Sequence, residues 1–399
     1  MRERRLFREL TLAVHGRRAP GVAQRAIVFD VVHRARSSRG RRAVVARRRR
    51  GMRQSATMRL DDDDDDDDDD GATVARDVAR PAYADAYVDA VAALERAIAR
   101  RARARGDCGT TSDWTPKDGA DAAARVLDTC GAHYTAWAFR MRCVEDAVDA
   151  SEGTAKAATL RDELAFAEAQ TTKNPKNYQV WNHARMVLER ADAAGAFEGL
   201  RDRAFAHANA ALMLDGKNIH AWSHRAWLVE RCDAWEEEMA FTEEMLAEDW
   251  MNNSAWNARF QCVTVCVERG DVGVLEREAA FATTAPRVDD DNESAWNYLR
   301  GLCAIAERDG SAIPRDVANR VVALAIDAAR TAAAPAPSRA PSRHAALLLA
   351  DRVAAEAVRD ADIGRAASAE SMFRNLATLD PLRGNYYRTR IDRLRAALA

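Results

Sequence analysis

The stretch Asn218-Ile219-His220-Ala221-Trp222-Ser223-His224-Arg225 shows a pattern that occurs five times in this chain: a polar residue, a tryptophan and a nearby basic residue. The other four copies lie at residues 133–140, 177–185, 253–259 and 293–300. Their tryptophans, at positions 137, 181, 222, 256 and 296, are 34 to 44 residues apart. The sequence between them is rich in Ala, Leu, Glu, Arg and Asp. Repeats of this length in helix-forming sequence indicate stacked helical hairpins.

Each repeat is expected to contain two helices. One begins at the tryptophan segment, often after an Asn or Ser that can cap its first turn. A second, amphipathic helix follows, for example over residues 236–248, and turns at 174–176, 215–217 and 289–292 separate the units. Because one hairpin cannot bury its own apolar face, stacking must supply the core. The sequence therefore predicts an all-α fold, a curved solenoid of helical hairpins.

The charge of the chain is unevenly distributed. The formal net charge is only −2, but residues 1–60 contain 18 Arg, no Lys and three acidic residues, and Asp61 to Asp70 form a run of ten. We expect residues 1–70 to be a disordered leader and spacer, and residues 71–399 to be the helical domain. A basic arm, a transit peptide, or an untranslated stretch before Met52 or Met58 are alternatives for the first part. A Pro- and Ala-rich loop is expected at 331–343.

The seven cysteines form no regular framework, which indicates reduced thiols in an intracellular protein. Cys262 and Cys266 lie one helical turn apart, but no His or Cys pair at zinc-finger spacing accompanies them, so we expect no metal site in this chain. No apolar run reaches the ~20 residues that a membrane helix needs. We also find no Walker-type glycine loop and no nucleophile elbow.

Four of the repeat motifs resemble the protein farnesyltransferase/geranylgeranyltransferase type I α subunit. The motifs are Asn174-Pro175-Lys176-Asn177-Tyr178-Gln179-Val180-Trp181, then 217–225, 248–259 and 292–299, in that order. The resemblance runs from about residue 83 to residue 387. It implies a right-handed α-α superhelix, crescent-shaped, that wraps around a β subunit.

The resemblance also implies a function. The heterodimer would transfer a farnesyl or geranylgeranyl group from its diphosphate to the cysteine of a C-terminal CaaX sequence. The β subunit would hold the catalytic Zn²⁺, Mg²⁺ would be needed, and the enzyme would be cytoplasmic. No nucleic acid or membrane span is expected.

By the same residue-by-residue match, Lys176 would reach the diphosphate, where a cation stabilises the leaving group. Asn218 and His220 would lie at the same diphosphate. Gln179 would donate a hydrogen bond to the C-terminal carboxylate of the peptide substrate, and Tyr134 and Tyr178 would line the peptide site. The alternative for each is an ordinary role: a solvated lysine, a helix-surface glutamine, tyrosines packed between repeats.

The chain departs from the family pattern at three places. Ile219 replaces a Tyr, His133 stands where an Asn is usual, and Ala184 replaces the first Arg of a His-His-Arg-Arg run. The repeat tryptophans are expected in the core. Arg140, Arg225 and Arg259 are expected to pair with acids of neighbouring hairpins.

Two other functions are possible from the sequence. The first is the α subunit of the Rab geranylgeranyltransferase, which has similar repeats but normally carries further domains, such as a leucine-rich array. The second is a non-catalytic helical-repeat scaffold that only binds proteins.

Overall fold

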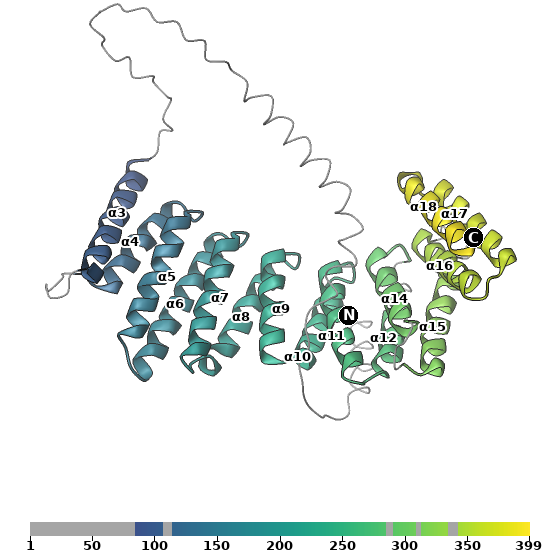
Figure 1. Ribbon diagram of the computed structural model, residues 1–399, viewed down its shortest axis with the longest axis horizontal. Helices are drawn as coiled ribbons and strands as arrows, with labels where there is room; N and C mark the ends of the chain where they lie inside the picture. Colours follow the sequence, from purple (N-terminus) through teal and green to yellow (C-terminus); the bar gives the residue numbers. More distant parts are fainter. Residues whose placement is uncertain (1–83, 107–113, 285–289, 309–312, 334–341) are drawn as a thin grey trace, which may run out of the picture. The chain divides into compact units, whose positions relative to one another are not determined.

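The described part of the chain is entirely helical. The computed structural model describes residues 84–106, 114–284, 290–308, 313–333 and 342–399, and these ranges contain α-helices, one short 3₁₀ helix and no strand (Figure 1). The predicted all-α repeat fold is therefore confirmed. All of these helices belong to one compact unit, Tyr83–Ala399.

The helices follow one another as the repeats predict. Five carry the repeat tryptophans: α5 (Tyr134–Asp149), α7 (Tyr178–Ala193), α9 (Ile219–Cys232), α11 (Asn253–Glu268) and α14 (Glu293–Ala306). Each is preceded by a partner: α4 (Pro116–Thr129), α6 (Thr154–Lys173), α8 (Glu198–Leu214), α10 (Trp235–Glu248) and α12 (Val274–Ala282). The remaining elements are α3 (Asp85–Gly106), α15 (Arg315–Ala333), α16 (Arg343–Arg359), α17 (Ile363–Leu379), η1 (Pro381–Arg383) and α18 (Gly384–Leu398).

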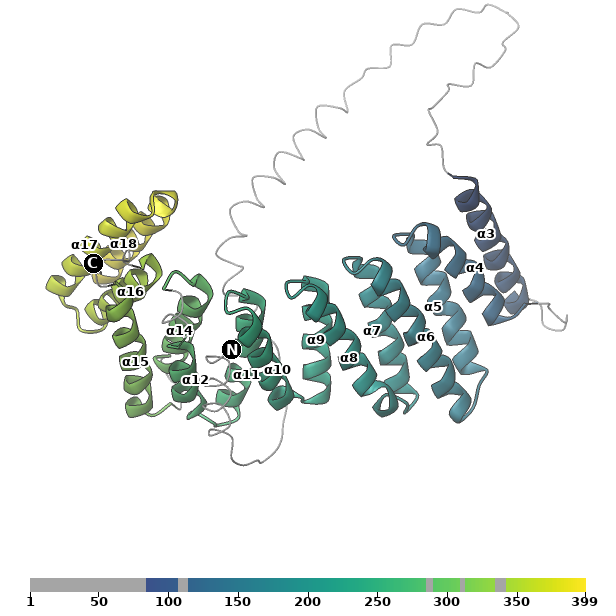
Figure 2. The same ribbon diagram turned by 180° about the vertical axis from the view of Figure 1, so that it is seen from behind.

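Most helices that are consecutive in the chain pack against each other, and the tryptophan helices also pack against one another. Contacts join α5 to α7, α7 to α9, α9 to α11, α11 to α14 and α14 to α16. From α3 to α15 the helices stand in chain order, and the view from behind shows the same succession (Figure 2). Each apolar layer is thus shared by neighbouring repeats, as in other solenoids.

A ladder of hydrogen bonds fixes the spacing of the repeats. Each repeat tryptophan donates its indole N–H to the carbonyl oxygen six residues earlier, always at 2.9 Å; for Trp222 the acceptor is Gly216. That same carbonyl accepts a second bond from the asparagine of the next repeat, so Gly216 also accepts from Asn252 at 2.9 Å. The amide oxygen of Asn252 in turn caps the first turn of its own helix, α11. A single Asn therefore starts one helix and binds the turn of the preceding repeat.

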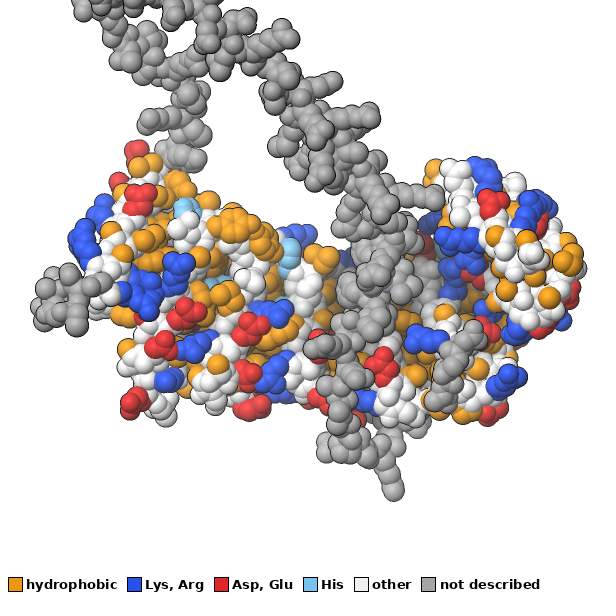
Figure 3. Space-filling model, viewed as in Figure 1, with side chains coloured by type: hydrophobic (Ala, Val, Ile, Leu, Met, Phe, Trp, Pro, Cys, Tyr) orange, Lys and Arg blue, Asp and Glu red, His pale blue; other side chains and the backbone are white. Residues whose placement is uncertain are grey.

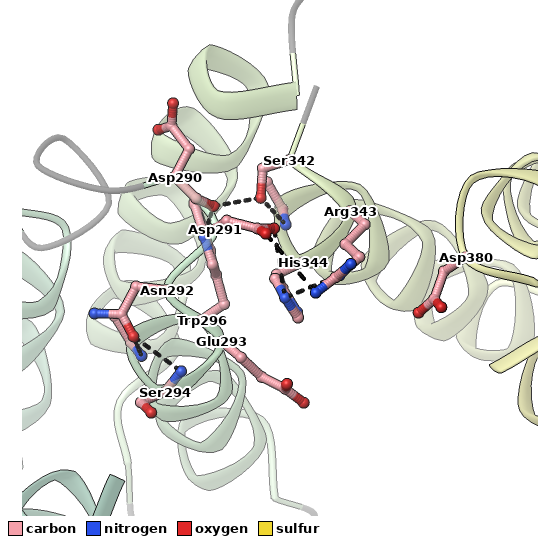
Figure 4. A network of polar contacts seen from close by, with 12 residues as sticks. Asp290, Asp291, Asn292, Glu293, Ser294, Trp296, Ser342, Arg343, His344 and Asp380 are labelled. Carbon is pink, nitrogen blue, oxygen red and sulfur yellow. Dashed lines mark hydrogen bonds and ion pairs between the residues drawn. The ribbon is translucent and has the colours of Figure 1, made fainter. Parts of the chain in front are cut away.

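The ladder continues one step beyond the last repeat tryptophan. Ser342 caps α16 by accepting from the backbone N–H of Ala345, and its hydroxyl donates to the carbonyl oxygen of Asp290 at 2.5 Å (Figure 4). Ser342 thus takes the place that asparagine has in the other repeats. Five repeats were predicted from their tryptophans. Helix α16 adds a sixth repeat to the ladder, because Ser342 keeps the cap and the link to the preceding turn although no tryptophan follows it.

Buried arginines join consecutive helices. The Arg259 guanidinium binds Glu278 of α12 at 2.6 and 2.8 Å, donates to the carbonyl oxygen of Met239 in α10, and lies 4.0 Å from the centre of the Phe281 ring. Arg140 makes the same contacts with Glu163 and Phe166 of α6 and with the carbonyl oxygen of Ala120. Arg225 binds Glu238 and covers Phe241 of α10, but donates to the side chain of Asn209 where the other two donate to a backbone carbonyl. Each arginine binds a glutamate three residues before the phenylalanine that it covers. The arginines were predicted to pair with acids of neighbouring hairpins; each pairs with an acid of the next helix, which in the predicted repeat is the second helix of the same hairpin.

Two of the five tryptophan helices, α7 and α14, lack this cluster, because Ala184 and Leu299 stand where the other three have arginine. At the α7–α8 contact the arginine position is Ala184, the glutamate position is Ala204, and the phenylalanine position is His207. The change to Ala184 is therefore matched across the interface, because both members of the ion pair are missing together. A buried arginine or glutamate without its partner would be strongly destabilising. Replacing both members of the pair by alanine therefore costs less than replacing either one alone.

Three predicted features lie outside the described residues: the Arg-rich leader, the Asp run, and the prolines of the loop expected at 331–343. At the ends of that expected loop, residues 331–333 belong to α15 and residue 343 begins α16. No described helix is long and apolar enough to cross a membrane. Of the cysteine pair, Cys262 is fully buried and Cys266 partly so, and burial raises the pKa of both thiols.

Candidate functional site

The turns that precede the tryptophan helices form the candidate site. We call this row the turn edge: residues 130–133, 174–177, 215–218, 249–252 and 290–292. The Trp and Asn ladder holds these turns side by side, since each Asn bonds the turn of the preceding repeat. The first residue of each following helix therefore projects from the same edge.

Lys176 lies on the turn edge and is accessible. Its side chain is 76% exposed, and its ammonium is 3.2 Å from the Asp215 carboxylate of the next turn. The backbone N–H of Lys217 and the Lys176 ammonium together lower the pKa of Asp215. An exposed ammonium with one exposed partner can exchange that partner for a phosphate at small cost, because surface ion pairs are weak.

The next lysine along the edge was not among the predicted site residues. Lys217 occupies the same position in the following repeat and lies 3.5 Å from Asp249. The signal was present, because both lysines directly precede a capping asparagine. The edge thus carries two Lys–Asp pairs in register.

Apolar side chains accompany the lysines. Tyr134 and Tyr178 are the first residues of α5 and α7, with 67% and 50% of their surface exposed, and their ring centres are 6.2 Å apart. Ile219 begins α9 and is 71% exposed. Figure 3 shows hydrophobic side chains on the surface over this part of the chain. Aromatic rings exposed beside a cation are typical of a binding surface.

Gln179 is less accessible than a ligand-binding side chain on a helix surface would be. It is buried, and its amide nitrogen donates to the carbonyl oxygen of Ala132 in the preceding turn at 3.2 Å. A side-chain amide has two N–H groups, so this bond leaves one donor. The structure therefore places Gln179 between two turns of the edge, next to Tyr178.

Asn218 and His220 differ in how accessible their side chains are. Asn218 is buried, and its amide oxygen accepts from the backbone N–H groups of His220 and Ala221 while its nitrogen donates to Pro175. The equivalent asparagines 177, 252 and 292 make the same kinds of contact, which shows a role shared by the whole ladder. His220 is partly exposed in the first turn of α9.

His133 explains one departure from the repeat pattern. It precedes α5 where the later repeats have asparagine, and its Nδ1 accepts from the backbone N–H of Ala136 at 3.1 Å. The imidazole thus caps the helix as the asparagines do.

As arranged, the turn edge can bind an anion at its lysines and an extended apolar or peptide ligand at its tyrosines. The described residues contain no group of three or more His, Cys, Asp or Glu side chains placed to hold a metal ion.

Known proteins match this chain through its repeats. The protein prenyltransferase alpha subunit repeat matches residues 160–191, 201–232, 235–266 and 275–306. These segments pair α6 with α7, α8 with α9, α10 with α11 and α12 with α14.

Curated relatives match over part of their length. A pea protein farnesyltransferase/geranylgeranyltransferase type-1 subunit alpha is 44% identical over 69 residues, which are 17% of this chain and 21% of the relative. The mouse geranylgeranyl transferase type-2 subunit alpha is 27% identical over 182 residues, 43% of this chain and 31% of the relative. The chain therefore spans about a fifth to a third of the length of these relatives.

A solved structure has the same fold. The Candida albicans protein geranylgeranyltransferase-I complexed with GGPP has 20% sequence identity and a TM-score of 0.61, with 78% of this chain and 92% of that chain covered. At this identity the likeness shows the fold alone. Four consecutive copies of the family's own repeat, carried on that fold, show that the chain belongs to the protein prenyltransferase α subunit family.

Proposed function

We propose that this chain is the α subunit of a heterodimeric CaaX protein prenyltransferase, which transfers farnesyl or geranylgeranyl from its diphosphate to a C-terminal-motif cysteine. The observation that carries the proposal is the exposed Lys176 beside the paired rings of Tyr134 and Tyr178 on the turn edge. The pea type-1 α subunit supports it through its higher identity to this chain. In this proposal the protein acts in the cytoplasm.

Lys176 would act on the leaving group. When the bond between the isoprenoid carbon and the diphosphate oxygen breaks, negative charge grows on the diphosphate. The Lys176 ammonium would leave Asp215 for this charge, and the partly exposed His220 would bind the same diphosphate. Asn218 would contribute by position, since its amide groups hold the turn of Lys176 to the start of α9.

The tyrosines and Gln179 would bind the peptide substrate. Tyr134 and Tyr178 offer ring surface to its side chains, and the remaining N–H of Gln179 would donate to its carboxylate. The described residues do not fit a metal ion, so we assign Zn²⁺ to the β subunit and expect Mg²⁺ to accompany the diphosphate.

A second function is favoured by a different observation. The mouse and rat geranylgeranyl transferase type-2 α subunits match a longer stretch, 182 residues, although at lower identity. The alternative is therefore the α subunit of a Rab geranylgeranyltransferase. A scaffold that binds proteins without catalysis is the third possibility, and the same experiment separates all three.

The test is co-expression of this chain with a type I β subunit, purification of the complex, and an assay with Zn²⁺ and Mg²⁺ for prenyl transfer to a CaaX peptide. We expect activity only when both chains are present. Transfer only to Rab proteins, with a type II β subunit, would support the alternative. No complex with any β subunit would contradict both enzyme functions and leave the scaffold.

Lys176→Ala tests the site within that complex. We expect prenyl transfer to slow by ~1–3 orders of magnitude while the heterodimer remains intact, because one charge at the leaving group is lost. Lys117→Ala is the matched control, since Lys117 makes the same kind of exposed ion pair, with Asp121 on α4, outside the turn edge. Equal rates for the two variants would remove Lys176 from the mechanism.

A further inference from the structure

A cleft of about 790 Å³ lies between the C-terminal helices, away from the turn-edge residues. Side chains of α14, α16, α17 and α18 line it. None of the proposed site residues contributes to it, so a ligand of this cleft would be independent of the proposed function.

The cleft is strongly basic. Five arginines line it against two acidic residues: Arg300, Arg352, Arg359, Arg390 and Arg393 against Glu307 and Asp351. Figure 3 shows Lys and Arg side chains gathered beside the C-terminal helices. A surplus of positive charge on concave surface attracts anions from solution.

The acids of the cleft are shared among the arginines. The Asp351 carboxylate, only 13% exposed, is 2.6 Å from Arg300 through one oxygen and 2.6 Å from Arg390 through the other. Arg352 binds Glu307. Two acids thus hold three guanidinium groups in place and leave an excess of positive charge. These contacts orient the arginines before any ligand arrives.

Arg359 and Arg393 are the exposed arginines of the group, and Arg359 pairs with Asp360, whereas Arg393 is the candidate for binding a ligand. It lies one turn after Arg390 in α18, is exposed, and makes no ion pair within the described part of the chain. Residues three positions apart on a helix are neighbours on its surface. Arg390 and Arg393 therefore present two adjacent guanidinium groups to the cleft, which suits an oxyanion with several oxygens.

The floor of the cleft is apolar. Its accessible apolar side chains are Ala304 of α14, Ala355 and Val358 of α16, and Ala397 of α18, while Leu348 and Phe373 border the cleft but are fully buried. Pockets that join an apolar wall to a few polar groups bind organic ligands rather than bare ions. The ligand should therefore carry both an anionic and an apolar group.

We propose that this cleft binds a phosphorylated compound with an apolar group, whose phosphate lies against Arg390 and Arg393 and whose apolar group lies on the floor. The phosphate can come from a soluble metabolite or from a lipid headgroup, and the chemistry of recognition is the same. Guanidinium groups bind phosphate through paired hydrogen bonds, which gives the site its preference for phosphate over a single-charged anion.

The test uses the full chain and isothermal titration with three probes: phenyl phosphate, inorganic phosphate and phenol. We expect saturable binding of phenyl phosphate, weaker binding of inorganic phosphate, and none of phenol. Arg393→Glu should weaken phenyl phosphate binding by about tenfold or more. Arg388→Glu is the matched control: it makes the same charge change on the same helix, outside the cleft, and should bind as the wild type does.

A second variant tests the floor without changing charge. Ala397 is exposed at the cleft, so Ala397→Trp should fill the space without disturbing the core, and it should weaken phenyl phosphate binding more than inorganic phosphate binding. Vesicles of phosphatidylcholine with phosphatidic acid separate the two sources. If the wild type sediments with these vesicles and Arg393→Glu does not, the ligand is a lipid headgroup. If the wild type binds phenyl phosphate but does not sediment with the vesicles, the ligand is a soluble compound.

Three results would overturn the proposal. One is no saturable binding of phenyl phosphate by the wild type up to about 10 mM. Another is an equal effect of Arg393→Glu and Arg388→Glu, which would show attraction to net charge alone. The third is loss of binding in Lys176→Ala, which would assign the phosphate to the turn edge instead.

Discussion

Two histidines, His224 buried and His207 half-buried, pack against Trp181 of α7, the helix whose arginine position is Ala184. The His207 ring stacks on Trp181 with centres 4.8 Å apart, and the His224 ring lies 5.4 Å from the same indole and 6.4 Å from His207. Both ring nitrogens of His207, and Nε2 of His224, are buried without a hydrogen-bond partner. Burial lowers the pKa of both imidazoles, that of His224 to about 3. The titratable groups that act on them are Glu168 and Arg203 at His207, and His207 and Arg185 at His224.

These histidines should make stability depend on pH. In the unfolded chain each binds a proton near its ordinary pKa of 6.5, whereas the folded protein holds it neutral. The stability is therefore fully present above pH 6.5 and is lost as the pH falls toward the folded value, by up to about 1.4 kcal/mol per pH unit for each histidine. His207→Phe restores the residue type of the other repeats and should reduce this loss.

The measurement is urea unfolding at about pH 7 and about pH 5.5, with the change in the free energy of unfolding compared between wild type and variant. His220→Phe, on the turn edge and outside this cluster, serves as the control and should behave as the wild type does. The same pH dependence in wild type and His207→Phe would contradict the assignment.

At the residue scale, the structure shows how accessible each residue picked out by the motif match is. The motif match picked out Lys176, and the structure finds it exposed. Gln179 is buried, and Asn218 uses its amide to bind two turns at once. Neither result could be foreseen from single motifs, because both depend on which turn of the preceding repeat lies alongside. Only the three-dimensional stack brings residues more than forty positions apart into contact.

At the scale of helices, the Arg–Glu–Phe clusters join one repeat to the next. Arg225 and Glu238 are both almost fully buried, with the guanidinium 2.6 Å from the carboxylate. Glu238→Ala should cost about 3–5 kcal/mol of unfolding free energy, because it leaves a buried guanidinium without its partner. The double variant Arg225→Ala with Glu238→Ala should cost less than the sum of the two single variants, with a coupling of about 0.5–3 kcal/mol.

The neighbouring repeat already has the sequence of this double variant, since Ala184 and Ala204 occupy the positions that correspond to Arg225 and Glu238. Urea unfolding of the four proteins in the cycle gives the coupling. The exposed pair Arg185–Glu189 provides the control and should show less than about 1 kcal/mol. Strictly additive costs at Arg225 and Glu238 would show that the pair does not join the helices.

The helical repeats were predictable because tryptophan marks them. The sixth step at α16 was not, because Ser342 keeps the cap and the link to Asp290 while no tryptophan follows. The Arg–Glu–Phe clusters were predicted only in part. The arginines were visible in the repeat, but their glutamates and phenylalanines lie in the next helix, at a distance along the chain from the arginine that differs between repeats.

At the scale of the molecule, the hydrogen-bond ladder turns a one-dimensional repeat into one continuous edge. Every step repeats the same two bonds to one carbonyl, so the first residues of α5, α7 and α9 project from neighbouring turns. Those residues, Tyr134, Tyr178 and Ile219, are large, apolar and exposed. Exposed apolar surface of this kind, in register along a rigid stack, indicates a protein-binding face.

Tyr178→Asp tests that face, on the proposed function. We expect the affinity for a β subunit to fall by about tenfold or more, because a central aromatic contact is replaced by a charge that must be desolvated on binding. The melting temperature of the isolated chain should hardly change, since half of the Tyr178 side chain is already exposed. Ile363→Asp on α17, 70% exposed and far along the chain from the turn edge, is the control for an added surface charge. Sedimentation of each variant with the β subunit gives the affinities. If Tyr178→Asp and Ile363→Asp bind the β subunit equally well, the partner lies elsewhere on the stack, and the tyrosine pair must then face the peptide alone.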